Sequence, residues 1–144
     1  MTQDVAVRHG LAARVPAFAA PVAVAVACGA ATLLLAAVDP HEAGHYPTCP
    51  SLYVTGWFCP GCGSLRAIHD LAHLNLAGAI DMNPFAVVAL GWLVWRWAWW
   101  LAATLGHGRR VKPSPAWVIY GVGAAVVVFW VLRNVGPFAP YLAP

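Results

Sequence analysis

Three cysteines gather in one stretch of the 144-residue sequence, at a spacing that supports only a few kinds of chemistry. Cys59 and Cys62 form a Cys-Pro-Gly-Cys unit, and Cys49 precedes it by ten residues. The segment 39–83 also holds four of the six histidines and four of the five carboxylates. Thiols in such a setting can exchange disulfides, bind a metal ion or form a structural disulfide.

In the first alternative, thiol–disulfide exchange, Cys59 and Cys62 are the candidate catalytic pair and Cys49 is a third thiol that resolves or relays. A helix is expected to begin beside Cys62, near Ser64. The positive end of its dipole favours the thiolate. Arg66 would add positive potential if the helix turns its side chain back toward the sulfurs.

A metal site is the second alternative, with Cys49, Cys59 and Cys62 as ligands and His69 or another loop histidine as the fourth. Three cysteines and one histidine are a common structural zinc set, so zinc is the possible cofactor. In the third alternative the cysteines form a structural disulfide or pack at a tight Pro-Gly turn. A single pair among three cysteines leaves one thiol over. The spacing alone leaves these alternatives open.

The residues after Cys62 predict an amphipathic helix over about 64–80. An apolar stripe recurs at helical spacing on one side; it consists of Leu65, Ile68, Ala72, Leu76 and Ala79. The polar face holds candidate site residues at i, i+3, i+4 and i+7, namely Arg66, His69, Asp70 and His73. Arg66 and Asp70 are expected to pair, and His69 and His73 could share a metal. His41 and His45 are expected to be solvated loop residues.

The run from Cys59 to Ala67, followed by Asn83-Pro84, resembles the signature of a bacterial family called domain of unknown function 2752. Its members are small polytopic membrane proteins with a Cys-Pro-x-Cys-Gly-x-Thr-Arg-Ala core. Two further pairs are similar to pairs of that family, namely Cys49-Pro50 and Arg133-Asn134. Ser64 stands where Thr is usual and keeps the hydroxyl. The resemblance, mainly over residues 39–90, implies architecture and membrane location but no reaction.

Composition identifies the solvent that the chain requires. Hydrophobic residues make up 61% of it and charged residues only 9%, against roughly 25% charged residues in soluble domains. A water-soluble domain and a disordered chain are therefore both excluded. The net charge of +3 is small and scattered, which argues against nucleic-acid binding.

Three stretches are apolar enough to cross a bilayer as helices, over about 16–38, 84–105 and 116–133. Asn83 is the expected N-cap of the second span, and Pro84 is its first helical residue. Five Lys and Arg residues flank the spans on the side of the N-terminus, against two on the other side. The positive-inside rule then predicts a cytoplasmic N-terminus and an extracytoplasmic segment 39–83.

Arg96 lies inside the second span among five tryptophans between Trp92 and Trp100. Tryptophans on all sides of a helix are typical of the membrane interface, and the favoured interpretation is an aromatic belt in which Arg96 reaches the headgroups. The alternative is an Arg96 that faces inward to a carboxylate or an anionic headgroup.

The sequence thus predicts an all-α protein of a bacterial cytoplasmic membrane, with residues 1–144 as one membrane domain. It has three transmembrane helices and one amphipathic interfacial helix in the first loop. The expected function is that of an accessory or interaction subunit, not an enzyme, with a structural cysteine loop. Thiol–disulfide exchange or metal binding is the alternative. Expected partners are membrane lipids and either a second copy or another membrane protein.

Overall fold

The computed structural model describes residues 16–42, 44–107 and 114–143. Within those ranges the chain is helical and contains no strand. The helices are α2 (Ala19–Ala37), α3 (Pro50–Thr55), α4 (Ser64–Ala72), α5 (Leu76–Met82), α6 (Pro84–Thr104), α7 (Ala116–Leu132) and α8 (Ala139–Leu142).

Two helices, α2 and α6, are long and apolar enough to cross a membrane. Their bounds agree with the first two predicted spans to within a few residues. Asn83 caps α6 as predicted, because its side chain accepts a hydrogen bond from the Ala86 amide and Pro84 follows at the first helical position. The third apolar helix, α7, has 17 residues and is shorter than the other two.

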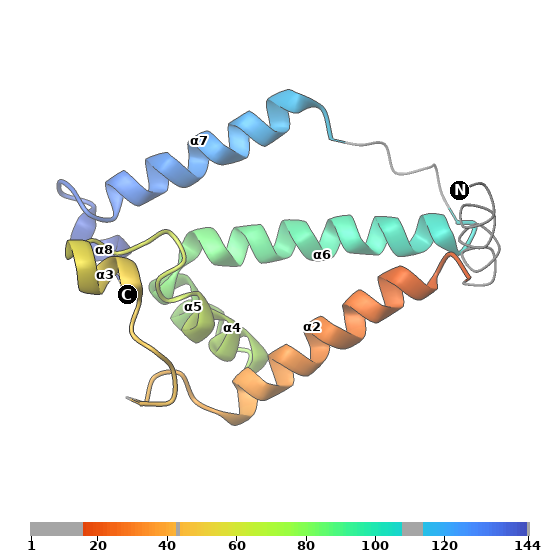
Figure 1. Cartoon of the computed structure of the whole chain (residues 1–144), viewed down its shortest axis with the longest axis horizontal. Helices are drawn as coiled ribbons and strands as arrows, with labels where there is room; N and C mark the ends of the chain where they lie inside the picture. Colours follow the sequence, from red (N-terminus) through yellow and green to blue (C-terminus); the bar gives the residue numbers. More distant parts are fainter. Residues whose placement is uncertain (1–15, 43, 108–113, 144) are drawn as a thin grey trace, which may run out of the picture.

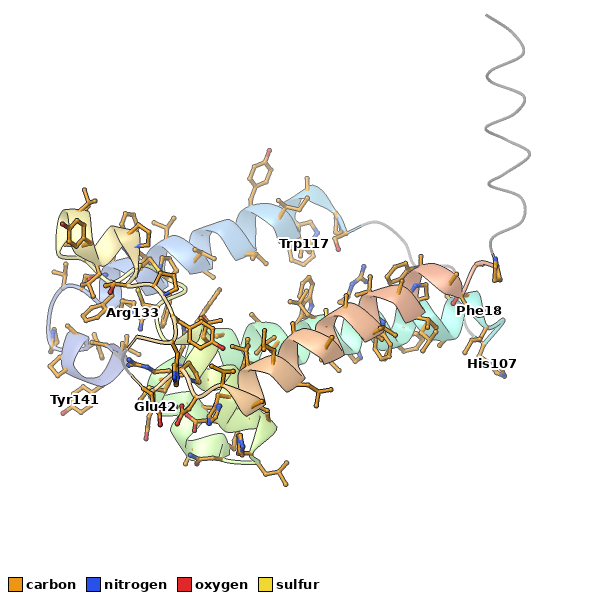
Figure 2. The ribbon with its side chains drawn as sticks, turned by 60° about the horizontal axis from the view of Figure 1, so that its bottom comes forward. Phe18, Glu42, His107, Trp117, Arg133 and Tyr141 are labelled. Carbon is orange, nitrogen blue, oxygen red and sulfur yellow. The ribbon has the colours of Figure 1, made fainter. Side chains whose placement is uncertain are left out.

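The long helices run between two ends of the molecule. Figure 1 shows the start of α2 and the end of α6 close together at one end, while α3, α8 and the end of α7 gather at the other. In Figure 2, Phe18 and His107 mark the first end, and Glu42, Arg133 and Tyr141 mark the second. A hydrogen bond of 2.9 Å from the Trp97 indole to the Pro21 carbonyl joins α6 to α2.

Helices α4 and α5 fill the space between α2 and α6 at the second end (Figure 1). The two side chains that are buried there are small: Ala67 of α4 and Ala79 of α5 have no exposed area. Large apolar side chains on the long helices are instead exposed, among them Leu33 and Val88, each at 72%. Exposed large apolar side chains on helices of this length are typical of membrane-spanning helices.

The predicted single helix over 64–80 is wrong in one respect, because it is broken into α4 and α5. Leu74 adopts the left-handed conformation at φ 60°. The Asn75 amide then donates to the Asp70 carbonyl, and the Leu74 amide donates to the Leu71 carbonyl. These two bonds form a Schellman cap, in which glycine is the usual left-handed residue. Asn75 is the N-cap residue of α5, the helix that begins directly after this break.

Candidate functional site

The sulfur atoms of Cys49, Cys59 and Cys62 all lie within 4.8 Å of one another. The Cys49 and Cys59 sulfurs are 3.4 Å apart, and the Cys59 and Cys62 sulfurs are 3.2 Å apart. A disulfide holds its sulfurs at about 2.05 Å, so the three cysteines are free thiols in partly buried positions. The three sulfurs therefore converge near the start of α4, as the metal alternative of the sequence requires.

The turn between Cys59 and Cys62 is built by local hydrogen bonds. The Cys62 amide donates to the Cys59 carbonyl over 3.1 Å, and the Cys59 amide approaches the Cys62 sulfur at 3.2 Å. Gly63 follows in the left-handed conformation at φ 80°, which glycine adopts without a steric penalty. The chain can therefore turn sharply from the cysteines into α4.

Cys49 is the N-cap residue of the short helix α3, which the sequence analysis did not predict. The pKa of Cys49 is lowered to about 7, first because the Leu52 amide at the start of α3 stabilises its thiolate and then because the Cys62 thiol donates to it. The Cys49 side chain nevertheless accepts no capping hydrogen bond that meets the usual geometric criteria. Burial raises the pKa of Cys62 to about 12, helped by hydrogen bonds with the other two thiols. The Cys49 thiol therefore ionises more readily than the Cys62 thiol.

Arg133, the C-cap residue of α7, lies behind the cysteine turn with only 1% of its surface exposed. Its Nη1 donates to the carbonyls of Cys59 and Cys62, each at 3.1 Å. The guanidinium also stacks against the Phe129 ring, 5.0 Å from its centroid. Its Nε and Nη2 atoms are buried without a hydrogen-bond partner among the described residues. No carboxylate of the described residues lies within ion-pair distance of it.

Two asparagines hold the same turn from either side. Asn83 is completely buried, and its Nδ2 donates to the Pro60 and Cys62 carbonyls, each at 3.0 Å, and to the Ser64 hydroxyl. Asn134 pairs with the backbone of Phe58, accepting from its amide at 2.8 Å and donating to its carbonyl at 2.9 Å. The starts of α4 and α6 and the end of α7 therefore meet at the cysteines.

A cavity of about 620 Å³ lies beside the three sulfurs. Glu42 and Arg66 line it together with the cysteines. Arg66 donates its Nε to the Pro40 carbonyl at 3.2 Å instead of pairing with Asp70. The predicted Arg66–Asp70 ion pair is absent from the ion pairs of the described residues.

The structure does not group His69 with the sulfurs. His69 instead lies with Asp39 and His41, and the ligand atoms of these three residues are also within 4.8 Å of one another. His73 stacks on the His69 ring with centroids 4.3 Å apart, and Asp70 lies 3.6 Å from the Nε2 of His41. His41 is an exposed residue of the segment after α2, as expected, but its contact with Asp39, whose Oδ1 lies 2.8 Å from its Nδ1, was not predicted.

Arg96 is half-buried on α6 and makes no hydrogen bond or ion pair with the described residues. Neighbouring indoles at Trp92, Trp95 and Trp99 are 42–55% exposed. Arg133 and Asn134 went unnoticed as site residues, although they were among the residues that carried the family resemblance. Their signal was an arginine next to an asparagine at the end of an apolar span, a costly placement without partners.

The family described as "Protein of unknown function (DUF2752)" has a sequence model that matches residues 49–97. The resemblance predicted from the cysteine motif is therefore confirmed over that segment. The match covers all three clustered cysteines and Asn83, whereas Arg133 and Asn134 lie beyond it. No curated protein and no solved structure matches the chain.

Proposed function

We propose that this protein is a membrane-embedded accessory or interaction subunit in which Cys49, Cys59 and Cys62 bind one zinc ion. The observation that carries the proposal is the mutual approach of three sulfurs within 4.8 Å, with no pair at disulfide distance. Thiolates are preferred zinc ligands. The bound ion would fix the loop between α2 and α6, where short helices have little core of their own.

Charge balance supports a thiolate–metal centre. Arg133 carries a buried positive charge, and no described carboxylate pairs with it. An unpaired buried charge is costly. One Zn²⁺ with three thiolates has a net charge of −1, which neutralises the guanidinium. Arg133 lies beside this group, because its Nη1 donates to the carbonyls of Cys59 and Cys62.

The spacing of the sulfurs fits zinc after a small adjustment. Tetrahedral zinc with bonds of about 2.3 Å holds two sulfurs about 3.8 Å apart. The observed separations of 3.2 and 3.4 Å would widen by about half an ångström. Because the three cysteines line the cavity, its open side would leave the fourth position to water or to a ligand from outside the described residues.

The membrane arrangement belongs to the same proposal. We place α7 across the bilayer with α2 and α6, the N-terminus in the cytoplasm, and the cysteine site at the extracytoplasmic surface of a bacterial cytoplasmic membrane. Arg133, beside the cysteine site, lies at the end of the molecule opposite Phe18 and His107 (Figure 2). This position supports exposure of the site on one side of the membrane. Exposed apolar side chains on α7, such as Ile119 at 66%, support contact with lipid, a second copy or another membrane protein.

Elemental analysis of the untagged protein in detergent tests the zinc site. Cys59→Ser is expected to lose one equivalent of zinc per chain relative to the wild type. Cys28→Ser is the matched control, because Cys28 is exposed on α2 and outside the sulfur group. Unchanged zinc content in Cys59→Ser would overturn the proposal.

Thiol–disulfide exchange is the second candidate, and the low pKa of Cys49 at about 7 favours it. The Cys49 thiolate would attack one sulfur of a substrate disulfide and expel the other sulfur as a thiolate. Cys59, 3.4 Å away, would lose its proton to solvent and attack the Cys49 sulfur. The second substrate thiolate would then leave, with the protein dithiol oxidised and the substrate disulfide reduced. A Cys49–Cys59 disulfide that cycles with a thiol buffer would support this function.

A further inference from the structure

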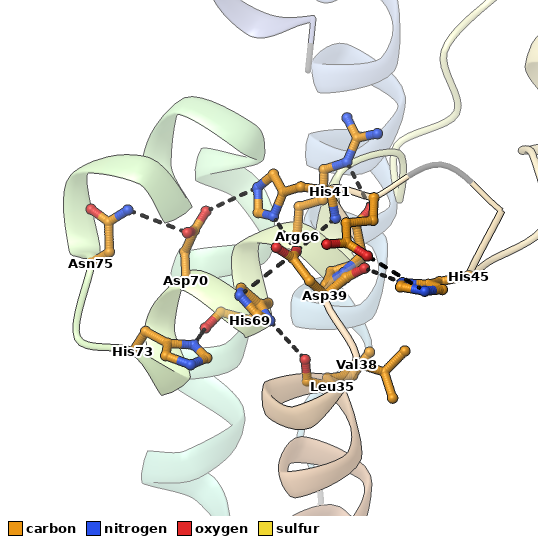
Figure 3. Close-up of polar contacts among 12 residues, drawn as sticks. Leu35, Val38, Asp39, His41, His45, Arg66, His69, Asp70, His73 and Asn75 are labelled. Carbon is orange, nitrogen blue, oxygen red and sulfur yellow. Dashed lines mark hydrogen bonds and ion pairs between the residues drawn. The ribbon is translucent and has the colours of Figure 1, made fainter.

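A second group of ligand-type side chains lies where α2 ends and α4 passes it. Asp39 and His41 follow the end of α2, and His69 lies on the second turn of α4 (Figure 3). Their ligand atoms lie within 4.8 Å of one another. The group shares no residue with the three-cysteine site.

The tautomer of His69 follows from its hydrogen bond. Its Nδ1 lies 2.7 Å from the Leu35 carbonyl, and a carbonyl only accepts, so Nδ1 carries the proton. In the neutral ring the lone pair is then on Nε2, which lies 3.7 Å from Oδ1 of Asp39. Two acceptors therefore face each other, with His69 only 14% exposed. A cation between them would turn this contact into an attractive one.

His41 completes the arrangement from the other side of Asp39. Its Nδ1 lies 2.8 Å from Oδ1 of Asp39, and its Nε2 lies 3.6 Å from Oδ2 of Asp70. The Asp70 carboxylate is itself held by the Asn75 amide at 3.2 Å. If a metal ion replaced the Nδ1 proton of His41, the Nε2 proton would point at Asp70.

Charge also favours a cation here. Every ion pair of the described residues joins a carboxylate to a histidine, and none involves lysine or arginine. Asp39, Glu42 and Asp70 together carry three negative charges, while Arg66 turns to the Pro40 carbonyl. A divalent cation would neutralise most of this charge without requiring the histidines to be protonated.

We propose that Asp39, His41 and His69 form a second metal site, for a divalent transition-metal ion such as Zn²⁺. One carboxylate oxygen and two imidazole nitrogens are a common zinc donor set. Ligands about 2.1 Å from a tetrahedral ion lie about 3.4 Å apart, between the observed 2.8 and 3.7 Å.

The surroundings of both histidines match those of metal ligands. Ligating histidines donate their second ring N–H to a carbonyl or a carboxylate, and Leu35 and Asp70 occupy these positions. The fourth position would face water, because Asp39 is 42% exposed and His41 36%. The ion would fasten the end of α2 to α4.

Metal titration of the full-length, untagged protein in detergent, with Cys49, Cys59 and Cys62 all changed to Ser, tests this site independently of the cysteines. This variant is expected to bind one equivalent of Co²⁺ without sulfur-to-cobalt charge-transfer absorption, and Zn²⁺ should displace it. Adding Asp39→Asn or His69→Gln should weaken binding by more than about 100-fold, since even outer-shell changes cost 10–100-fold. His45→Gln is the matched control, an exposed histidine of the same loop outside the group.

A triple serine variant that is folded by circular dichroism but binds no Co²⁺ would overturn the inference. So would full binding by the His69→Gln variant. If the serine substitutions prevent folding, Asp39→Asn in the wild-type chain gives the answer, because it should remove one metal equivalent and spare the thiolate-bound one. Cys59→Ser should lose only the metal ion bound by the thiolates, and this result tests only the cysteine site. The two proposals can therefore fail separately.

Discussion

Arg133 shows how a single residue ties the cysteine turn to the last apolar helix. Its Nη1 reaches backbone carbonyls more than seventy positions earlier in the chain, at Cys59 and Cys62. The side chain is buried against Phe129. A lysine could supply the charge, but it lacks the planar guanidinium that stacks on the Phe129 ring and at the same time donates hydrogen bonds to the two carbonyls.

Arg133→Met should therefore weaken zinc binding by about 10–100-fold, as loss of a supporting group at a metal site does. It should also lower the free energy of unfolding by about 2–3 kcal/mol, because hydrogen bonds from a charged donor are lost. Chelator competition and thermal unfolding measure the two effects. Arg133→Lys, the control, should lose less affinity because it keeps the charge. Wild-type affinity in the methionine variant would rule out this role.

The reactivity of Cys49 should follow its lowered pKa of about 7. Alkylation needs the thiolate, so the rate in metal-free, reduced protein should rise about tenfold from pH 6 to pH 8 and then level off. A thiol of ordinary pKa would gain about 100-fold over the same range. Cys62, with its pKa raised to about 12, should stay unmodified throughout.

Mass spectrometry of the alkylated Cys28→Ser variant locates the modified residue without interference from the exposed thiol on α2. First modification at Cys62, or a steep hundredfold rise at Cys49, is incompatible with this electrostatic picture.

Residue types and spacing were enough to group the three cysteines as one candidate site, but they wrongly added His69 as a neighbour of the sulfurs. His69 lies five residues after the start of α4, about 8 Å along the helix axis, and this distance separates it from the turn at Cys62. Arg133 could not be found by spacing, because its approach depends on how α7 packs. The pairing of His41 with Asp39 and His69 likewise depends on where the chain turns after α2.

At the scale of elements, the break between α4 and α5 lets the two short helices fit between α2 and α6. Leu74 takes the left-handed position at φ 60° and is 92% exposed. Left-handed backbone costs a side chain with a Cβ about 1–2 kcal/mol, which glycine avoids.

Leu74→Gly should therefore raise the free energy of unfolding by about 1 kcal/mol. Leu76→Gly is the control: an exposed leucine at the first position of α5, where glycine should be neutral or destabilising. Thermal unfolding in detergent compares the two. A lower melting temperature for Leu74→Gly than for the wild type would contradict the assigned cap.

The long elements were predictable because an uninterrupted apolar run of about twenty residues has few alternatives to a helix. The cap at Asn83-Pro84 was also readable from sequence. The helix break was not, since leucine is a helix former and its apolar spacing continues across the break. Helix α3 was missed because six residues show no clear period, although Cys49-Pro50 had the form of a helix start.

At the scale of the whole molecule, Glu42 and Arg133, beside the proposed sites, lie at the end opposite Phe18 and His107 (Figure 2). In intact cells an impermeant maleimide should therefore label Cys49 once metal has been removed by an external chelator. A variant that retains only Cys28, which lies within α2, should resist labelling. Labelling of Cys49 that requires cell lysis would reverse the proposed orientation.

Counting accessible thiols before and after removal of metal tests the central claim most directly. In purified, untagged protein we expect none of the three clustered cysteines to be alkylated, and Cys49 to be alkylated after treatment with a strong chelator, with zinc released in parallel. Mass spectrometry reports both states. Alkylation of Cys49 before chelation, or a mass 2 Da lower because a disulfide joins two of the clustered cysteines, would contradict a zinc–thiolate centre.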